Sequence, residues 1–139
     1  MSITVRFGNL DDARDIVQGD QHVPDHILIW KLQNQEIVIA TDDEELIGYL
    51  RLEFLWSKYP YIGLILVHPD YRGKGLGRRL LRFVEEHIKK KGLKLIYSSS
   101  QVNENSPQEW HRKMGFKECG IINGINEGNI GELFFVKEL

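Results

Sequence analysis

The residues best suited to chemistry in this sequence lie in one stretch, positions 64–79, which reads LILVHPDYRGKGLGRR. Its apolar beginning predicts a strand, and Pro69 ends that strand because proline cannot donate to a sheet ladder. Gly73, Gly75 and Gly77 follow, directly before a helical pattern. Glycines allow a tight turn whose consecutive N–H groups point at one anion, and the helix N-terminus adds its own N–H groups and its dipole. The stretch therefore predicts a phosphate-binding turn.

Basic side chains crowd the start of the helix after this turn, at Arg72, Lys74, Arg78 and Arg79. Cations oppose the helix dipole at this end, where acidic residues are favoured. A local rule that is broken at one place is typical of a functional site. The alternative interpretation is a solvated basic turn before an ordinary helix.

Two nucleotide-binding motifs do not match this turn. A P-loop needs Ser or Thr after its Gly-Lys pair, but Gly75 follows Lys74. A dinucleotide-binding turn needs Gly-x-Gly-x-x-Gly and an acidic residue that closes the next strand. Here the glycines are spaced Gly-x-Gly-x-Gly, and the expected next strand ends in serines near Ser100. Neither nucleotide motif accounts for the turn.

The sequence RGKGLG at positions 72–77, after VHP at 67–69, resembles the acetyl-coenzyme A signature of the GNAT N-acetyltransferase superfamily. The sequence WHRKMGF at 110–116 resembles that superfamily's second marker, an aromatic-Tyr-x-Lys-x-Gly-Phe helix end. His111 stands where the superfamily usually has tyrosine. The two markers occur in the right order, and the resemblance covers essentially the whole chain in the order of its elements.

This resemblance implies that the protein uses acetyl-CoA as co-substrate and transfers its acetyl group to a primary amine. It implies that main-chain N–H groups of the turn hold the pyrophosphate, while the end of the preceding strand lies beside the pantetheine arm. An asparagine after the next strand often contacts that arm, and the spacing leaves two choices. The implied cofactor-binding residues are Leu66, Val67, Arg72, Gly73, Lys74, Gly75, Leu76, Gly77, Arg78 and either Asn103 or Asn105.

Two residues are candidates for catalysis. His111 is expected to give a proton or a hydrogen bond to the departing thiolate, since histidine titrates near neutrality; the alternative is that it packs beside Trp110. Glu53 is the candidate base for the acceptor amine, because it lies on a strand near the expected cleft; the alternative is a strand carboxylate paired with Arg51 or Lys58. A further alternative is a non-catalytic acyl-CoA-binding or regulatory module of the same fold, because fold does not fix function.

Hydrophobic periodicity predicts an α/β protein with a mixed sheet in the order βααβββαβαββ. The resemblance implies a GNAT-like fold, with a mostly antiparallel central sheet, one splayed parallel strand pair and flanking helices. Strands 61–67 and 93–100 should form that pair, because a single helix joins them. The other expected strands are 3–7, 36–40, 46–55, 116–122 and 132–137, and the expected helices follow Asn9 and cover 25–35, 76–91 and 106–115.

Composition limits the remaining possibilities. The 139 residues suit one domain, 1–139, and 42% hydrophobic and 27% charged residues are ordinary for a globular protein. A net charge of −2 does not suggest nucleic-acid binding, and no apolar run suggests a membrane span. Cys119 is the only cysteine, which suits a reducing compartment such as the cytoplasm.

The partners expected are a small-molecule or peptide amine and, at most, a second copy of the chain, so that the protein is a monomer or a homodimer. No metal is expected, because His22 and His26 lack an evident third ligand. The acceptor pocket is expected to draw on aromatic and histidine residues of the first helices and hairpin loops, namely His22, His26, Trp30, Trp56, Tyr59 and Tyr61.

Overall fold

The computed structural model describes residues 2–139. In it the chain forms two compact units, one built from residues up to Glu53 and Gly63–Glu86, the other from Phe54–Ile62 and His87–Leu139. The strands form one mixed sheet in the hydrogen-bonded order β1-β2-β3-β4-β5-β7-β6, and β4 (Tyr59–Val67) contributes residues to both units.

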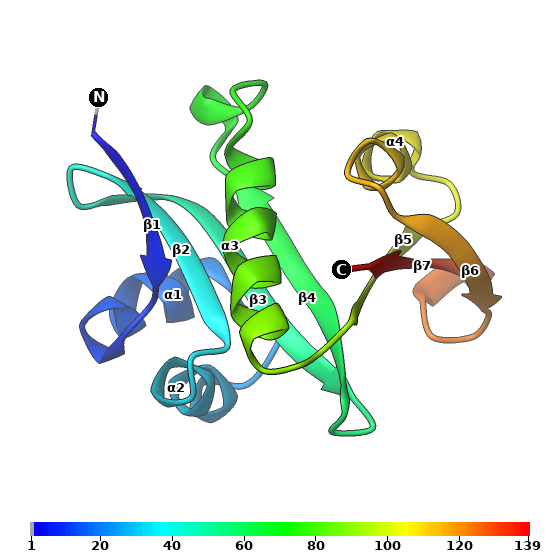
Figure 1. Ribbon diagram of the computed structural model, residues 1–139, viewed down its shortest axis with the longest axis horizontal. Coiled ribbons are helices and arrows are strands. Elements are labelled where there is room, and N and C mark those ends of the chain that lie inside the picture. The colour runs from blue at the N-terminus through cyan, green and yellow to red at the C-terminus, as the bar shows by residue number, and fades with distance from the viewer. Residues whose placement is uncertain (1) are drawn as a thin grey trace. The chain divides into compact units, whose positions relative to one another are not determined.

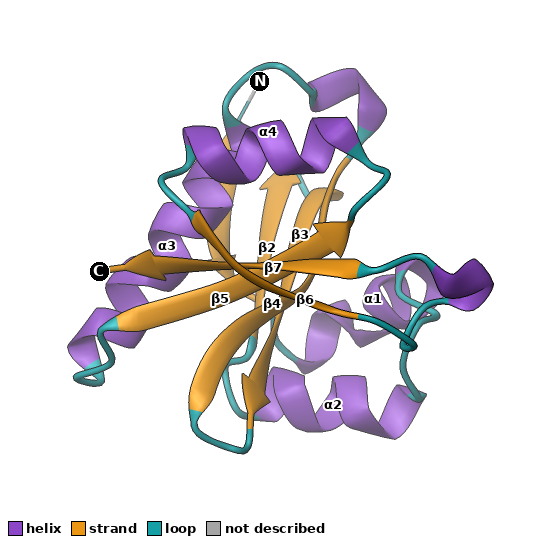
Figure 2. Cartoon of the chain, turned by 90° about the vertical axis from the view of Figure 1, so that its right-hand side faces the viewer, coloured by secondary structure: helices purple, strands orange, loops and turns teal. Residues whose placement is uncertain are grey.

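The first unit contains three antiparallel strands, the second half of β4 and most of the long helix α3. Figures 1 and 2 show α3 on one face of these strands and α1 and α2 on the other. The elements are β1 (Ile3–Phe7), α1 (Ala13–Gly19), α2 (Asp25–Gln33), β2 (Ile37–Asp42), β3 (Glu45–Leu55) and α3 (Leu76–Lys90).

Alternation along β3 builds the two faces of this unit, because successive strand side chains point in opposite directions. Tyr49 packs with side chains of α1, α2 and β2 in a buried cluster. Gly48 faces α3 instead. A Cβ at Gly48 would lie 3.2 Å from the Leu80 Cδ1 atom and 3.1 Å from the Ala40 Cβ atom. Glycine at this position therefore lets α3 approach the sheet closely.

The second unit contains β5 (Leu95–Gln101), α4 (Asn105–Lys113), β6 (Lys117–Ile122), β7 (Glu132–Glu138) and the beginning of β4. β7 pairs antiparallel with both β5 and β6, whereas β4 and β5 run parallel with Tyr61 opposite Tyr97. Both views show α4 on one face of β5, β7 and β6 (Figures 1 and 2).

The predicted order of helices and strands and the parallel pair in a mixed, mostly antiparallel sheet are confirmed. The bounds differ by a few residues; α2, for example, ends at Gln33 rather than at Gln35. The expected divergence of β4 and β5 toward their C-terminal ends stays a prediction, because those ends belong to different units. Within residues 2–139 no helix combines the length and the apolar character needed to cross a membrane.

Candidate functional site

The predicted phosphate turn leaves a run of main-chain donors without protein partners. Gly73 and Gly75 have φ values of +75° and +78°, the left-handed region that favours glycine. Within the described part of the chain, the N–H groups of residues 73–78 donate to no protein acceptor; the next one, at Arg79, donates to the Gly75 carbonyl (3.1 Å). The N–H groups of Gly75 and Gly77 are among these free donors, so an anion at this helix end would meet several donors at once.

The turn is held in place by contacts on both of its sides. The Tyr71 hydroxyl donates to the Asp42 carboxylate (2.5 Å), and this bond raises the pKa of Tyr71 to about 12. The Arg72 Nε donates to the Val67 carbonyl (3.0 Å), which ties the turn back to the end of β4. The side chains of Arg72, Lys74, Arg78 and Arg79 are exposed. The turn thus combines a fixed backbone with accessible positive charge.

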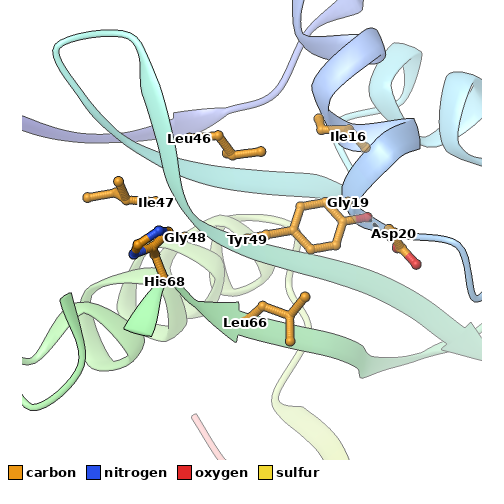
Figure 3. A pocket seen from close by; sticks show the side chains of 9 residues that line it. All are labelled: Ile16, Gly19, Asp20, Leu46, Ile47, Gly48, Tyr49, Leu66 and His68. Atoms are coloured by element: carbon orange, nitrogen blue, oxygen red, sulfur yellow. Dashed lines mark hydrogen bonds between the residues drawn. The ribbon is translucent and has the colours of Figure 1, made fainter. Parts of the chain in front are cut away.

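A pocket of about 260 Å³ lies in the first unit, between α1, β3 and the end of β4 (Figure 3). Figure 3 shows the Tyr49 ring extending from β3 toward Asp20, at the end of α1. The walls are mostly apolar. The lining residues are Ile16, Gly19, Asp20, Leu46, Ile47, Gly48, Tyr49, Leu66 and His68.

Asp20 anchors the polar end of this pocket. Its Oδ2 atom accepts from the Tyr49 hydroxyl (2.6 Å) and from the Arg51 Nε (2.7 Å), and its Oδ1 accepts from the His22 N–H (3.2 Å). Burial favours the neutral acid, but the bonds from Tyr49 and Arg51 outweigh it and lower the pKa of Asp20. Burial and the Asp20 carboxylate raise the pKa of Tyr49, so the hydroxyl keeps its proton. Asp20 and Arg51 therefore form a neutralised, buried pair beside the pocket.

Glu53, the candidate base, is held between two cations. One of its oxygens lies 2.9 Å from the Lys31 Nζ, and the other accepts from the Arg51 Nη1. Lys31 is buried and also bonds Glu36 (2.9 Å) and the Leu52 carbonyl (2.6 Å). The alternative interpretation, that Glu53 pairs with Arg51 or Lys58, is correct for Arg51. The second cation that contacts Glu53 is Lys31 and not Lys58. Both carboxylate oxygens of Glu53 are therefore held by cations of the protein.

His111 differs most from its predicted environment. Its side chain is buried, Nδ1–H donates to the Pro107 carbonyl (2.7 Å), and Nε2 lies 2.7 Å from the Ser98 Oγ. Its ring stacks on Phe135 with centroids 4.4 Å apart. Burial lowers the pKa of His111 to about 4. The expected titration near neutrality is thus corrected, because this site favours the neutral ring and occupies both nitrogens.

The remaining candidate residues follow β5 or end β4, as their order in the chain predicted. Asn103 and Asn105 follow β5, and both are exposed, with Asn105 beginning α4. Leu66 and Val67 end β4, and Leu66 also lines the pocket. No residue of the expected aromatic and histidine set lines that pocket. Among residues 2–139 there is no group of three or more His, Cys, Asp or Glu that could hold a metal ion.

Apart from Leu66, sequence patterns missed the residues that line the pocket, because they come from separate elements. A weak signal existed in β3, where Tyr49, Arg51 and Glu53 share one face by alternation. A second group, of which the sequence had pointed only to Tyr61, lies in the other unit. There the Tyr61 hydroxyl and the Ser99 Oγ are 2.6 Å apart, and Ser99 donates to Glu132 (2.5 Å). This chain of hydrogen bonds joins β4, β5 and β7 on one face of the sheet.

Comparison with known proteins agrees with this geometry. A model of the "Acetyltransferase (GNAT) family" matches residues 9–116. Streptothricin acetyltransferase of Streptomyces lavendulae is 30% identical over 101 residues, which cover 71% of this chain and 53% of that protein. S-alkylcysteine N-acetyltransferase of Bacillus subtilis (strain 168) is 30% identical over 95 residues, which cover 62% of this chain and 53% of that protein.

The chain spans about half the length of these two curated relatives. Among solved structures, Ard1 from Thermoplasma volcanium has the same fold, with a TM-score of 0.85, 11% identity, and coverage of 100% of this chain and 99% of that chain. Because the family model covers most of the sequence, the chain belongs to the GNAT acetyltransferase family.

Proposed function

We propose that this protein, as a single domain over residues 1–139, transfers the acetyl group of acetyl-CoA to a primary amine of a small molecule or peptide. The observation that carries the proposal is the run of unpaired N–H groups at residues 73–78, at the start of α3 and among exposed basic side chains. Family membership supports the same activity. Acetyl-CoA supplies an acetyl thioester, an electrophile that a neutral amine can attack.

In this proposal each part of the cofactor site has a separate task. The N–H groups from Gly73 to Arg78, Leu76 and Gly77 included, bind the pyrophosphate, and the Arg72 and Lys74 side chains add long-range attraction. Leu66 and Val67 flank the pantetheine arm, and Asn103 or Asn105 gives it a hydrogen bond. The fit is supported by the turn itself, since a Cβ at Gly73 or Gly75 would meet no protein atom within 4 Å, which leaves the space above the donors open.

The acceptor must lose a proton, because an alkylammonium titrates near ~10. Glu53 is engaged by Lys31 and Arg51, and His111 is buried with both nitrogens bonded. We therefore propose that neither acts as base or acid and that the acceptor releases its proton to solvent. This predicts that turnover rises with pH toward the pKa of the acceptor amine. Glu53 then links β3 to α2, and His111 links α4 to β5.

The same observation favours a second candidate function, a non-catalytic module that binds acyl-CoA. A release assay for the CoA thiol separates the two, with polyamines, amino acids, aminoglycosides and peptide N-termini as acceptors. Thiol release that depends on an amine supports the transferase. Tight cofactor binding without any amine-dependent release supports the binding module.

The cofactor turn is tested by calorimetry with acetyl-CoA and the variant Gly75→Val. A side chain at this positive φ strains the backbone and intrudes above the donors, so binding should be lost while the circular dichroism spectrum is kept. Gly92→Val is the matched control, since Gly92 also has a positive φ (+80°) and open space around its Cβ position, but follows the other end of α3. Equal affinity in Gly75→Val and the parent would overturn the assignment of the turn.

Charge at the turn is tested by the double variant Arg72→Glu with Lys74→Glu. Reversing both charges should weaken acetyl-CoA binding and flatten its dependence on salt, because screening acts on the attraction that these side chains supply.

We also propose a cytoplasmic location, which the single unpaired and exposed Cys119 supports. The monomer or homodimer expected from the sequence remains a proposal, to be measured by sedimentation.

A further inference from the structure

The pocket of the first unit has walls that suit an apolar ligand group. Aliphatic side chains line it from α1, β3 and β4, namely Ile16, Leu46, Ile47 and Leu66, and the Tyr49 ring adds a flat apolar surface (Figure 3). The pocket is smaller than the roughly 300–1,000 Å³ common for drug-sized ligands. Its size therefore limits the ligand group to a short chain or a small ring.

The polar side-chain atoms of Asp20 and Tyr49 in the pocket already have protein partners. Asp20 has little capacity left to bind a ligand cation, because both of its oxygens already accept protein hydrogen bonds and Arg51 balances its charge. The Tyr49 hydroxyl donates a hydrogen bond to Asp20, and the His68 Nδ1 accepts one from the Asp70 N–H (3.1 Å). A second ammonium group placed here would lose its hydration without gaining a counterion.

We infer that this pocket receives the apolar side chain of the acceptor, so that the preferred acceptor is a compact primary amine with an uncharged aliphatic, thioether or small aromatic chain. The inference rests on the proposed acetyl transfer and names its acceptor class. It disfavours polyamines and aminoglycosides, whose additional cations have no place in this lining. Specificity then lies in Leu46 and its apolar neighbours rather than in a charged anchor.

A series of amino acids with one primary amine each tests the inference. In 2-aminobutyrate, norvaline and norleucine the chain grows by one methylene at a time, and glutamine and arginine supply a polar and a cationic chain of comparable length. Each methylene that enters the pocket should raise kcat/KM about fourfold, so norleucine should exceed 2-aminobutyrate about 15-fold. Glutamine and arginine should be poorer than norleucine by at least about tenfold.

A binding measurement keeps this test separate from the test of acetyl transfer. Methyl NMR signals of Ile16, Leu46 and Leu66 should shift with norleucine and not with arginine, whether or not turnover occurs. Methyl shifts without amine-dependent thiol release would refute the proposed acetyl transfer but would support the pocket as a binding site for apolar side chains. Turnover that ignores chain length, or methyl signals that respond equally to arginine, would overturn the inference.

Leu46→Glu places a carboxylate in the pocket and should reverse the preference, lowering norleucine turnover at least about tenfold relative to arginine. Leu10→Glu is the matched control, because Leu10 is an exposed leucine of the same unit outside the pocket; it should keep the parent's preference. Leu46 packs against the buried cluster, so Leu46→Ala serves as a second variant. It enlarges the pocket, and the best chain should become longer; an unchanged optimum would refute the role of Leu46.

Discussion

The buried His111 ring makes the stability of this protein depend on pH in a predictable direction. An unfolded histidine titrates near 6.5, whereas burial lowers the pKa of His111 to about 4 in the folded chain. The folded state therefore binds this proton less readily than the unfolded state. The stability that the neutral ring contributes is fully present above pH ~6.5 and is lost as the pH falls toward ~4.

The size of the effect follows from the two pKa values. With a folded pKa of about 4, the loss from His111 alone is ~2 kcal/mol at pH ~5 and reaches ~3 kcal/mol near pH ~4. His111→Phe removes the titration, although it also leaves the Ser98 hydroxyl and the Pro107 carbonyl without their partner. The variant should thus be less stable near pH ~7.5 but should lose less on acidification than the parent.

Urea unfolding of parent and variant near pH ~7.5 and ~5 measures this difference, and NMR of the histidine ring protons gives the folded pKa directly. His26→Phe is the control, since His26 is an exposed histidine on α2 and its loss should leave the parent's pH dependence intact. A ring titration near ~6.5, or equal losses on acidification in parent and His111→Phe, would refute the account. Because the His111 ring stays neutral, it should cause no fall in turnover as the pH rises through ~6.5. His111→Phe should therefore remove no such fall from the pH profile.

Two further changes test the network around Glu53. Gly63→Ala should lower the free energy of unfolding by about 1–3 kcal/mol in urea, because its Cβ would lie 2.7 Å from both the Arg51 Nη1 and the Glu53 Cγ. Gly19→Ala is the control and should not change stability, because its Cβ would meet no atom within 4 Å. Equal effects of the two variants would contradict this packing. Lys31→Met should lower the free energy of unfolding by about 3 kcal/mol, because it removes the Lys31 bonds to Glu36 and to the Leu52 carbonyl. Lys58→Met, at an exposed site, should change stability little. A small effect of Lys31→Met would show that Lys31 does not stabilise this network.

The conformation of the glycine turn could be predicted from the sequence because the turn is local. Its donors are consecutive N–H groups, the glycines that permit their geometry are adjacent in the chain, and the following helix has a clear period, with Leu76, Leu80, Val84 and Ile88 all buried. The same reasoning found the correct position for His111 on α4. The sequence could not show what surrounds the His111 ring, because the Ser98 hydroxyl and the Phe135 ring come from two strands, β5 and β7.

Glu53 shows where such reasoning stops. Strand alternation correctly put Arg51 and Glu53 on one face of β3, and that alone left the carboxylate available as a base. What spacing could not show is Lys31 on α2, whose side chain reaches Glu53 from an element that carries no recognisable motif. A partner that approaches through the tertiary fold leaves no trace in local spacing. The acceptor pocket has the same character, because Ile16, Leu46 and Leu66 meet only after α1, β3 and β4 have packed. The turn proposed for the cofactor thus depends on consecutive residues, whereas the pocket proposed for the acceptor depends on packing between distant ones.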